Sequence, residues 1–260
     1  MINRILEHKK QSLENKKKSL PLDLLIKKTA SCKKSKNNFK ENISKPGRLN
    51  LIAEIKRSSP SLGIFKKNAD IKAIAKIYKK EGVDAVSVLT EEKFFNGLDS
   101  DLLLVKNETA LPVLRKDFII DEYQVYESVL LGADAILLIA KIVTPKQLSN
   151  LYVLANKLNL YSIAEVHDEK DLDKVLEAGC DIIGVNNRNL DTLQIDLETS
   201  FRLIRLIPES KVKISESGVE NNDHMKYLKG LGFNSVLIGT TFMQAEDIGV
   251  KIQEIMKGIN

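Results

Sequence analysis

The sequence predicts a closed barrel of eight parallel strands, each followed by a helix, which is the (β/α)₈ class of α/β fold. From Leu51 onward, eight short apolar bursts rich in β-branched residues alternate with longer stretches of helical periodicity. These units span about 210 of the 260 residues, and barrels of this class typically have about 250 residues. A doubly wound sheet is the alternative, but it usually has fewer strands and a GxGxxG turn after the first one, and this sequence contains no such turn.

The eight expected strands can be assigned in order along the chain. They are LIAEI from Leu51, VDAVSVL from Val83, LPVL from Leu111, AILLIA from Ala135, LYSIAEV from Leu160, DIIGV from Asp181, KVKIS from Lys211 and NSVLIG from Asn234. Several of the intervening helices end in a recurring glycine, in EGVDAV, LGADAI, EAGCDI and LGFNSV. Glycine at this position is typical of a helix C-terminus, so these glycines support the strand and helix count and receive no chemical role.

Residues 1–48 are expected to form an N-terminal helical extension and residues 49–260 the barrel, in a single domain overall. Between residues 1 and 46 there are thirteen Lys and Arg against four Asp and Glu, in a chain whose net charge is +5. Because no aromatic residues are interleaved and no nucleic-acid-binding motif is present, we interpret this charge as a solvated helix face rather than a contact with nucleic acid or an acidic membrane. The expected buried side of these helices is Ile5, Leu13, Leu20, Leu22, Leu24 and Leu25.

Composition favours a protein of the reducing cytoplasm. The two cysteines, Cys32 and Cys180, provide neither a disulfide framework nor the spacing of a metal site. The N-terminal residues lack the apolar core of a signal peptide, and no apolar run approaches the length of a membrane span. No metal, membrane or nucleic acid is therefore expected as a partner.

Charged residues follow the first and third expected strands, at the barrel rim where active sites of this fold lie. Glu54 and Lys56 are two residues apart and so face the same side; we interpret them as reactive groups, with a buried ion pair as the alternative. Lys116 lies where the third strand leaves the sheet, and a solvated loop lysine is its alternative. Residues 57–61, RSSPS, offer hydroxyl and N–H groups to an anion.

Further polar and aromatic residues follow the second, fourth and fifth strands. Glu165 is a second candidate carboxylate in the mouth, whereas His167 is interpreted as a surface residue and Lys141 as solvated. The second strand leads into KFFNG, in which Phe94 or Phe95 either walls an apolar ligand or packs on a neighbouring helix.

The last three strands end in segments suited to anion binding. The sixth ends in NNRN at residues 186–189, a cluster of hydrogen-bond donors for a carboxylate, hydroxyl or phosphate. The seventh and eighth end in SESG at 215–218 and IGTT at 238–241. Phosphate sites of this fold are frequently formed by the loops after these two strands. The mouth therefore predicts chemistry on an anionic, phosphorylated substrate, and Gly239→Val is expected mainly to weaken its binding.

The strand-end motifs resemble those of the indole-3-glycerol-phosphate synthase family of tryptophan biosynthesis, in the same order and spacing. The matching segments are AEIKRSSPS, VLTEEKFFNG, LRKDFIIDEYQV, ADAILLI, AEVHDEKDL, IGVNNRNL, SESGV and LIGTTFM. The leader ILEHKKQSLENKKKSLPLDLL is similar to the family's N-terminal helical extension, which covers the barrel mouth. Two departures concern Leu98, where the family often has Ser, and the complete absence of Trp, which some relatives use to cover the aryl ring.

The resemblance implies closure of 1-(2-carboxyphenylamino)-1-deoxyribulose 5-phosphate to indole-3-glycerol phosphate, with loss of carbon dioxide and water and without an organic cofactor or metal. It implies that Lys116 is the general acid on the carbonyl oxygen and that Glu165 acts in later proton transfers. Lys56, the partner of Glu54, would meet the substrate carboxylate or assist dehydration. The other implied substrate contacts are Ser59, Phe95, Phe118, Asn186, Arg188, Glu216 and Ser217, with Gly218, Gly239 and Thr240 at the phosphate.

The resemblance also implies a small anthranilate-derived substrate and a monomeric enzyme, and it leaves open whether the basic segment docks to other enzymes of the tryptophan pathway. Two other classes of function stay open: a Schiff-base aldolase that uses Lys56 or Lys116, and a barrel that binds a phosphate ligand without turning it over. Deletion of residues 1–46 is expected to leave a folded barrel with greatly weakened catalysis, because the mouth would lose its cover.

Overall fold

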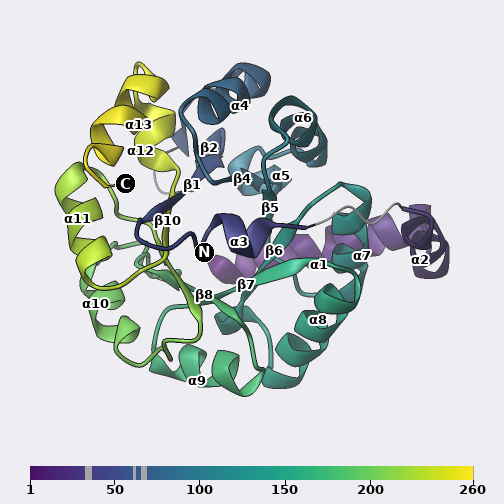
Figure 1. Ribbon diagram of the computed structural model, residues 1–260. Coiled ribbons are helices and arrows are strands. Elements are labelled where there is room, and N and C mark those ends of the chain that lie inside the picture. The colour runs from purple at the N-terminus through teal and green to yellow at the C-terminus, as the bar shows by residue number, and fades with distance from the viewer. Residues whose placement is uncertain (33–36, 61–62, 66–68, 260) are drawn as a thin grey trace.

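The computed structural model describes residues 1–32, 37–60, 63–65 and 69–259 and shows a closed barrel of parallel strands (Figure 1). The barrel strands are β1 (Asn50–Ile55), β4 (Ala85–Leu89), β5 (Val113–Lys116), β6 (Ala135–Ile139), β7 (Tyr161–Val166), β8 (Ile182–Asn186), β9 (Val212–Glu216) and β10 (Ser235–Ile238). They follow one another around the barrel in chain order, and β10 pairs with β1 to close it. Each predicted burst overlaps one of these strands, so the predicted fold class is confirmed. A short antiparallel pair, β2 (Ser58–Ser59) and β3 (Gly63–Ile64), lies in the loop after β1.

Helices surround the barrel as an outer ring, as Figure 1 shows. The ring consists of α4 (Ile71–Lys80), α6 (Asp99–Thr109), α7 (Glu122–Leu130), α8 (Pro145–Lys157), α9 (Glu169–Glu177), α10 (Glu198–Ile204), α11 (Asn222–Gly230) and α13 (Ile248–Met256). Shorter turns occur at strand ends: α5 (Glu92–Phe95), the 3₁₀ helix η1 (Ala140–Ile142) and α12 (Thr240–Gln244). Several ring helices begin with a side-chain cap that satisfies the first free N–H groups. These caps are Asp70, Asp121, Thr144, Asp168, Asn221 and Asp247.

The recurring glycines lie where the sequence predicts them. Gly82, Gly132, Gly179 and Gly232 follow α4, α7, α9 and α11, with φ between 71° and 90°. This left-handed conformation carries no steric penalty for glycine. It ends each helix and turns the chain into the next strand.

Alternate residues of each strand pack into two separate cores. In β1, Ile52 belongs to the cluster inside the barrel, whereas Leu51, Ala53 and Ile55 pack between the sheet and the helices. The same alternation directs Glu54 inward with Ile52, into the cavity at the mouth of the barrel.

The first helix lies at the mouth, the end where the strands finish, and the second lies outside the ring beside α7. α1 (Ile2–Ser19) starts over the cavity and runs outward past α7 to α2 (Leu22–Ala30) (Figure 1). Ile5, Leu13 and Leu25 are buried as predicted, but Leu24 is 45% exposed. That part of the prediction was wrong because α2 contacts the barrel through one narrow face only.

The prediction that the basic charge of this segment is a solvated face was also wrong in part. Lys9 Nζ lies 2.7 Å from Asp117 Oδ1, and Lys16 Nζ lies 2.7 Å from Glu127 Oε1. Lys17 pairs with Asp121 at 2.8 Å. One side of α1 is therefore fastened to acidic groups of the barrel rim and of α7.

A third helix of the extension, α3 (Phe39–Asn42), lies at the opposite end of the barrel. Phe39 and Ile43 are fully buried and join the cluster inside the barrel. The Ile43 carbonyl accepts hydrogen bonds from Asn50 and Ser235, at the starts of β1 and β10. The N-terminal segment therefore closes both ends of the barrel, whereas the sequence predicted a cover for the mouth alone.

Among the described residues, no helix combines the length and apolar character that crossing a membrane requires.

Candidate active site

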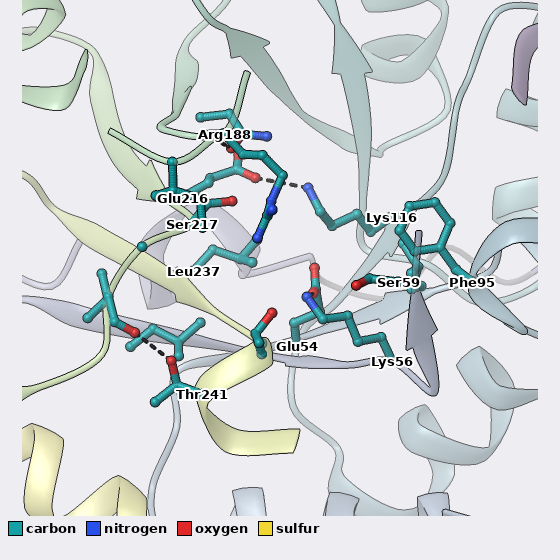
Figure 2. A pocket seen from close by; sticks show the side chains of 18 of the residues that line it. Glu54, Lys56, Ser59, Phe95, Lys116, Arg188, Glu216, Ser217, Leu237 and Thr241 are labelled. Atoms are coloured by element: carbon teal, nitrogen blue, oxygen red, sulfur yellow. Dashed lines mark hydrogen bonds and ion pairs between the residues drawn. The ribbon is translucent and has the colours of Figure 1, made fainter. Parts of the chain in front are cut away.

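A cavity of about 1060 Å³ opens at the carboxyl ends of the strands, beneath the start of α1. Figure 2 shows side chains from several strand ends pointing into it. All the predicted site residues line this one cavity: Glu54, Lys56, Ser59, Phe95, Lys116, Phe118, Glu165, Asn186, Arg188, Glu216, Ser217, Gly218, Gly239 and Thr240. Residue 61, which the sequence grouped with Ser59 as a possible anion contact, lies outside the described residues.

Lys116 projects from the end of β5 into a group of carboxylates. Its Nζ lies 2.9 Å from Glu216 Oε2 and 3.3 Å from Glu165 Oε2. Burial opposes the charged amine, but Glu216, Glu165 and Glu54 outweigh it and raise the pKa of Lys116 above its ordinary value. The sequence left the sign of this shift open. The structure favours an ammonium held among carboxylates at neutral pH.

Glu54 and Lys56 form an ion pair on the neighbouring wall. Lys56 Nζ lies 2.8 Å from Glu54 Oε1, and the Glu54 side chain is almost fully enclosed. Burial favours the protonated acid, but Lys56 and Lys116 together lower the pKa of Glu54 below its usual range. Glu54 and Lys56 therefore form the buried ion pair that the sequence analysis gave as the alternative. Both residues also line the cavity, so the ion pair does not exclude the reactive role.

Glu165 and Glu216 share the Lys116 ammonium yet differ in their surroundings. Burial raises the pKa of Glu216 to about 7, against the opposing effect of Lys116. Glu165 is equally buried, but Lys116 and His167 lower its pKa to about 2. We therefore place an ionised carboxylate at Glu165 and the more readily protonated one at Glu216.

His167 is not a surface residue, and the sequence-based interpretation was wrong. Its side chain is 7% exposed, with Nε2 at 3.3 Å from Glu165 Oε1 and Nδ1 at 3.4 Å from Asp171 Oδ2. Burial disfavours the imidazolium, but Asp171 and Glu165 raise the pKa of His167 to about 9. Asp168 caps α9 as the sequence suggested. The capping pattern was therefore correct, but it gave no indication that the His167 ring points inward.

Arg188 and Asn186 approach from the end of β8. In Figure 2 the Arg188 side chain extends into the cavity between Glu216 and the Glu54–Lys56 pair. Its guanidinium donates to the Leu193 carbonyl at 3.0 Å, and its backbone N–H donates to Asn186 Oδ1. Burial lowers the pKa of Arg188, yet a guanidinium stays charged, so it provides a fixed cation for an anionic ligand.

One side of the cavity is apolar. Ile2 and Ile5 of α1 line it, as do Phe95 and Phe118, whose ring centroids are 6.2 Å apart. Phe94, the other aromatic residue of the loop, instead packs edge-on against His8 of α1 at 6.1 Å. Phe95 therefore forms part of the cavity wall, and Phe94 packs on a neighbouring helix.

Glycines keep two of the carboxylates in place. A Cβ on Gly239 would collide with Glu54 Oε1, and a Cβ on Gly184 would collide with Glu216 Oε1. The sequence singled out Gly239 only for phosphate and did not identify Gly184, although the lone glycine in the DIIGV strand indicates a close approach. Both glycines shape the site by leaving room for an ionised side chain.

The loops after β9 and β10 lie together beside this apolar and charged surface. Thr241 Oγ1 donates to the Val219 carbonyl at 2.6 Å and joins the two loops. Gly218 has φ of 88° and Ser217 has φ of 66°, so the backbone turns sharply where these two residues line the cavity. This is the part of the site where a phosphate group was predicted.

Arg115 and Asp117 flank Lys116 in sequence; Arg115 is buried outside the cavity, whereas Asp117 lies at its edge, beneath α1. Arg115 is almost fully buried and pairs with Glu127 at 2.7 Å and with Asp117 at 3.3 Å. Despite burial, Lys9 and Arg115 lower the pKa of Asp117 to about 2. This network links the strand that carries Lys116 to α1. The sequence indicated it only as charge at a strand end.

Two residues that the sequence set aside have local roles. Lys141 is exposed as expected and pairs with Asp191 at 2.6 Å. Leu98 precedes α6 without a side-chain hydrogen bond to the helix and is 47% exposed, so the loop lacks the cap that a hydroxyl residue would offer. No cluster of three or more potential metal ligands occurs among the described residues.

The fold and the site together define a class, the (β/α)₈-barrel enzymes whose functional groups lie at the carboxyl ends of the strands. Solved structures of similar fold include 3-hexulose-6-phosphate synthase from Salmonella typhimurium, with a TM-score of 0.64 and 14% identity over 80% of this chain and 96% of that one. Thiamine phosphate pyrophosphorylase from Pyrococcus furiosus has a TM-score of 0.59 and 15% identity over 80% and 94%. At such identities these likenesses concern the fold alone.

The sequence comparisons are more specific. The family model described as Indole-3-glycerol phosphate synthase matches residues 2–255. The indole-3-glycerol phosphate synthase of Thermoanaerobacter pseudethanolicus is 45% identical, over 99% of this chain and 97% of its own. That of Alkaliphilus metalliredigens is 41% identical, over 100% and 99%. The chain belongs to the indole-3-glycerol phosphate synthase family.

Proposed function

We propose that this chain closes the indole ring of indole-3-glycerol phosphate from 1-(2-carboxyphenylamino)-1-deoxyribulose 5-phosphate, with loss of carbon dioxide and water. The observation that carries the residue-level proposal is a buried ammonium, Lys116, held 2.9 Å from Glu216 and 3.3 Å from Glu165 in a closed-over cavity. The cavity volume of about 1060 Å³ is at the upper end of the range for small-molecule sites, about 300–1,000 Å³.

Ring closure requires that an aryl carbon attack a ketone, which places negative charge on the carbonyl oxygen. A proton donor aimed at that oxygen stabilises the transition state. Lys116 is suited to this role because its neighbouring carboxylates keep it protonated. Decarboxylation then restores the neutral ring, and dehydration completes the indole.

The later steps need a group that accepts a proton. Glu165 is suited to this role because it is ionised beside Lys116, and Glu216, with its higher pKa, can hold a proton close by. Lys56 is proposed to meet the substrate carboxylate or assist dehydration, oriented by Glu54 at 2.8 Å. These groups are close enough to exchange protons within one enclosed site.

Substrate binding is proposed to divide along the cavity. The phosphate would lie by the backbone of Gly218, Gly239 and Thr240, and the aryl ring by Phe95, Phe118 and the start of α1. Arg188, Asn186, Ser59 and Ser217 would contact the polar middle of the substrate. This division matches the apolar and polar surfaces of the cavity described above.

The proposed setting is a monomeric cytoplasmic enzyme that needs no metal or organic cofactor. Residues 1–48 are proposed as a helical extension of the barrel of residues 49–260. Association with other enzymes of tryptophan biosynthesis stays an open question. Sedimentation of the purified protein, alone and mixed with those enzymes, would test these statements.

The test of the function is formation of fluorescent indole product from the substrate by purified protein. Lys116→Met should lower kcat by about 10²–10⁴-fold, the usual contribution of general acid catalysis, while substrate Kd changes little. Lys146→Met, on the exposed start of α8, is the matched control and should retain full turnover. Near-normal turnover in Lys116→Met, with Lys56→Met inactive but still binding, would reassign the acid to Lys56.

The two other classes of function predict different results in the same experiments. A Schiff-base aldolase needs a neutral amine, which the raised pKa of Lys116 disfavours, and borohydride with substrate would trap a covalent adduct. A phosphate-binding barrel without catalysis would bind the substrate tightly and release no product.

A further inference from the structure

A buried ionisable side chain next to the candidate site, His167, has no role in the mechanism proposed above. His167 lies directly behind Glu165, on the side away from Lys116, and its side chain is 7% exposed. The ring lies between two carboxylates, with Nε2 at 3.3 Å from Glu165 Oε1 and Nδ1 at 3.4 Å from Asp171 Oδ2. Neither nitrogen has a hydrogen bond in this geometry, so both contacts are ion-pair contacts, and a carboxylate close to each nitrogen favours the imidazolium.

The same arrangement fixes the direction of the Glu165 carboxylate. One oxygen, Oε2, faces Lys116 at 3.3 Å and the other, Oε1, faces the ring of His167. The carboxyl group is therefore held between two cations, one on each oxygen. A rotation of the group would break both contacts.

The local chain geometry holds the ring in this position. His167 follows the last residue of β7, and its backbone N–H donates to Asp171 Oδ2 at 3.3 Å. Asp171 lies in the first turn of α9, and its own N–H donates to the capping Asp168. The start of α9 thus presents a buried carboxylate, 7% exposed, to the far side of the ring.

The charged groups around His167 favour the imidazolium from several elements. Glu165 on β7 and Asp171 on α9 contact it directly. Asp191, in the loop after β8, also interacts with it electrostatically, while pairing with Lys141 of η1. An opposing cation, Lys116, lies on the other side of Glu165.

We propose that His167, as an imidazolium bridging Glu165 and Asp171, is a positioning residue that keeps the Glu165 carboxylate directed at Lys116 and ionised for the proton transfers after ring closure. This inference rests on the proposed function for its catalytic consequence, but the bridge itself is a property of the folded chain. It explains why two buried carboxylates beside one ammonium differ: within the described part of the chain, Glu165 pairs with both Lys116 and His167, whereas Glu216 pairs with Lys116. Glu165 is then the proton acceptor, and Glu216 is the carboxylate that takes up a proton more readily.

A first experiment reads the protonation state of His167 in the wild-type protein. The chain has three histidines, so nitrogen NMR of ¹⁵N-histidine-labelled protein, with His167→Asn for assignment, isolates one ring. The His167 ring should be doubly protonated at pH 8 and titrate near pH 9, and in Asp171→Asn it should titrate at lower pH. A neutral ring at pH 8, with an ordinary midpoint near 6.5, would overturn the proposal.

A second experiment compares the pH dependence of kcat/KM in the wild type, His167→Asn and Asp171→Asn, with Asp173→Asn as control. Asp173 is exposed on the same helix. Asparagine at 167 can donate a hydrogen bond but carries no charge, so the acid limb should move up by about one pH unit or more. Turnover would then be about tenfold lower on that limb and would recover in alkaline buffer, whereas the control profile should match the wild type.

Two results separate the possible failures. If the wild type forms no product, the proposed function is wrong, and the NMR titration still decides whether the bridge exists. If the wild type is active and His167→Asn loses activity equally at every pH, His167 is only structural and the inference is wrong. If His167→Asn does not fold, the pH profile of Asp171→Asn and the wild-type NMR titration decide whether His167 acts as a charged positioning residue.

Discussion

At the mouth of the barrel, α1 lies over a cavity lined by ionisable side chains, and ion pairs such as Lys9–Asp117 at 2.7 Å hold it there. At the opposite end, Phe39 and Ile43 fill the interior and are fully buried. Both ends are closed by the same N-terminal segment, but by different interactions. At the mouth, charge contacts act together with buried Ile5, whereas the opposite end is closed by fully buried apolar side chains and cannot open without loss of packing.

The two ends of the barrel therefore serve different purposes: the mouth carries the candidate site, and the opposite end contributes to stability. At the mouth, Glu165 Oε1 and Glu216 Oε1 have no hydrogen-bond partner among the described residues, which is costly in a folded protein. At the other end, the Ile43 carbonyl accepts from Asn50 and Ser235. Asn50 Oδ1 at this end also lacks a partner, but the unpartnered carboxylate oxygens of Glu165 and Glu216 lie where a substrate can supply partners.

The largest effect is expected from truncation. Deletion of residues 1–46 should prevent folding of the barrel, contrary to the expectation from the sequence, because it removes Phe39 and Ile43 from the interior. Truncating such side chains typically costs about 3–5 kcal/mol for Phe and about 2–5 kcal/mol for Ile, in proteins stable by about 5–15 kcal/mol.

Deletion of residues 1–30 should leave a folded barrel and raise KM about 10- to 100-fold, from the lost apolar contacts of Ile2 and Ile5. Circular dichroism and the product assay distinguish these outcomes, and a cooperatively folded 1–46 deletion would refute the assigned role of α3.

A matched pair of substitutions makes the comparison sharper. Phe39→Ala should lower the free energy of unfolding by about 3–5 kcal/mol and leave KM and kcat of the folded fraction unchanged. Ile5→Ala, at the cavity, should raise KM and cost less stability because its site already adjoins open space. Urea denaturation and steady-state kinetics on both variants test this, and a large KM change in Phe39→Ala would contradict the division between the two ends.

Gly239→Ala should act at the mouth alone. The added Cβ collides with the Glu54 carboxylate, and displacing a reacting group by about 1 Å can cost about 100-fold, so kcat should fall by that order. The sequence predicted mainly a binding defect at this position. Gly230→Ala, where a Cβ meets open space, is the control. A rise in KM with normal kcat would favour the phosphate role over the contact with Glu54.

The smallest effects are expected among the lysines of α1. Lys17→Met removes a half-exposed pair with Asp121 and should cost at most about 1 kcal/mol. Lys9→Met should cost more, about 1–3 kcal/mol, because Asp117 is buried and loses a charged partner. Urea denaturation at low and high salt gives both numbers. Equal effects would mean that α1 is held by its apolar face rather than by charge.

Strand order and the position of the site could be predicted from sequence because both depend on local patterns. The bursts are periodic, and residues such as Lys116 and Glu165 follow them directly, so the closed barrel brings them together. The lysine contacts of α1 could not be predicted, because Lys9 and Asp117 are 108 positions apart by their numbering and no local pattern joins them.

One misjudged residue and one that the sequence analysis did not single out show where local patterns mislead. His167 precedes a helix cap, a typical surface context, yet the end of β7 turns its ring inward toward Glu165. Phe39 lies in a short, largely polar stretch, and only the closed barrel reveals an apolar opening of matching size. In both cases the deciding information is the position of another strand or helix.

The hydrogen bond from Ser235 to the Ile43 carbonyl joins residues that are 192 positions apart, and β1 obtains its second neighbour only when β10 pairs with it. Contacts over such separations close large loops and slow folding. During synthesis on the ribosome, one edge of β1 therefore stays unpaired, and Ile43 lacks its contact with Ser235, until β10 has been synthesised. The nascent chain is most exposed to mispairing in the interval before residues 235–238 emerge.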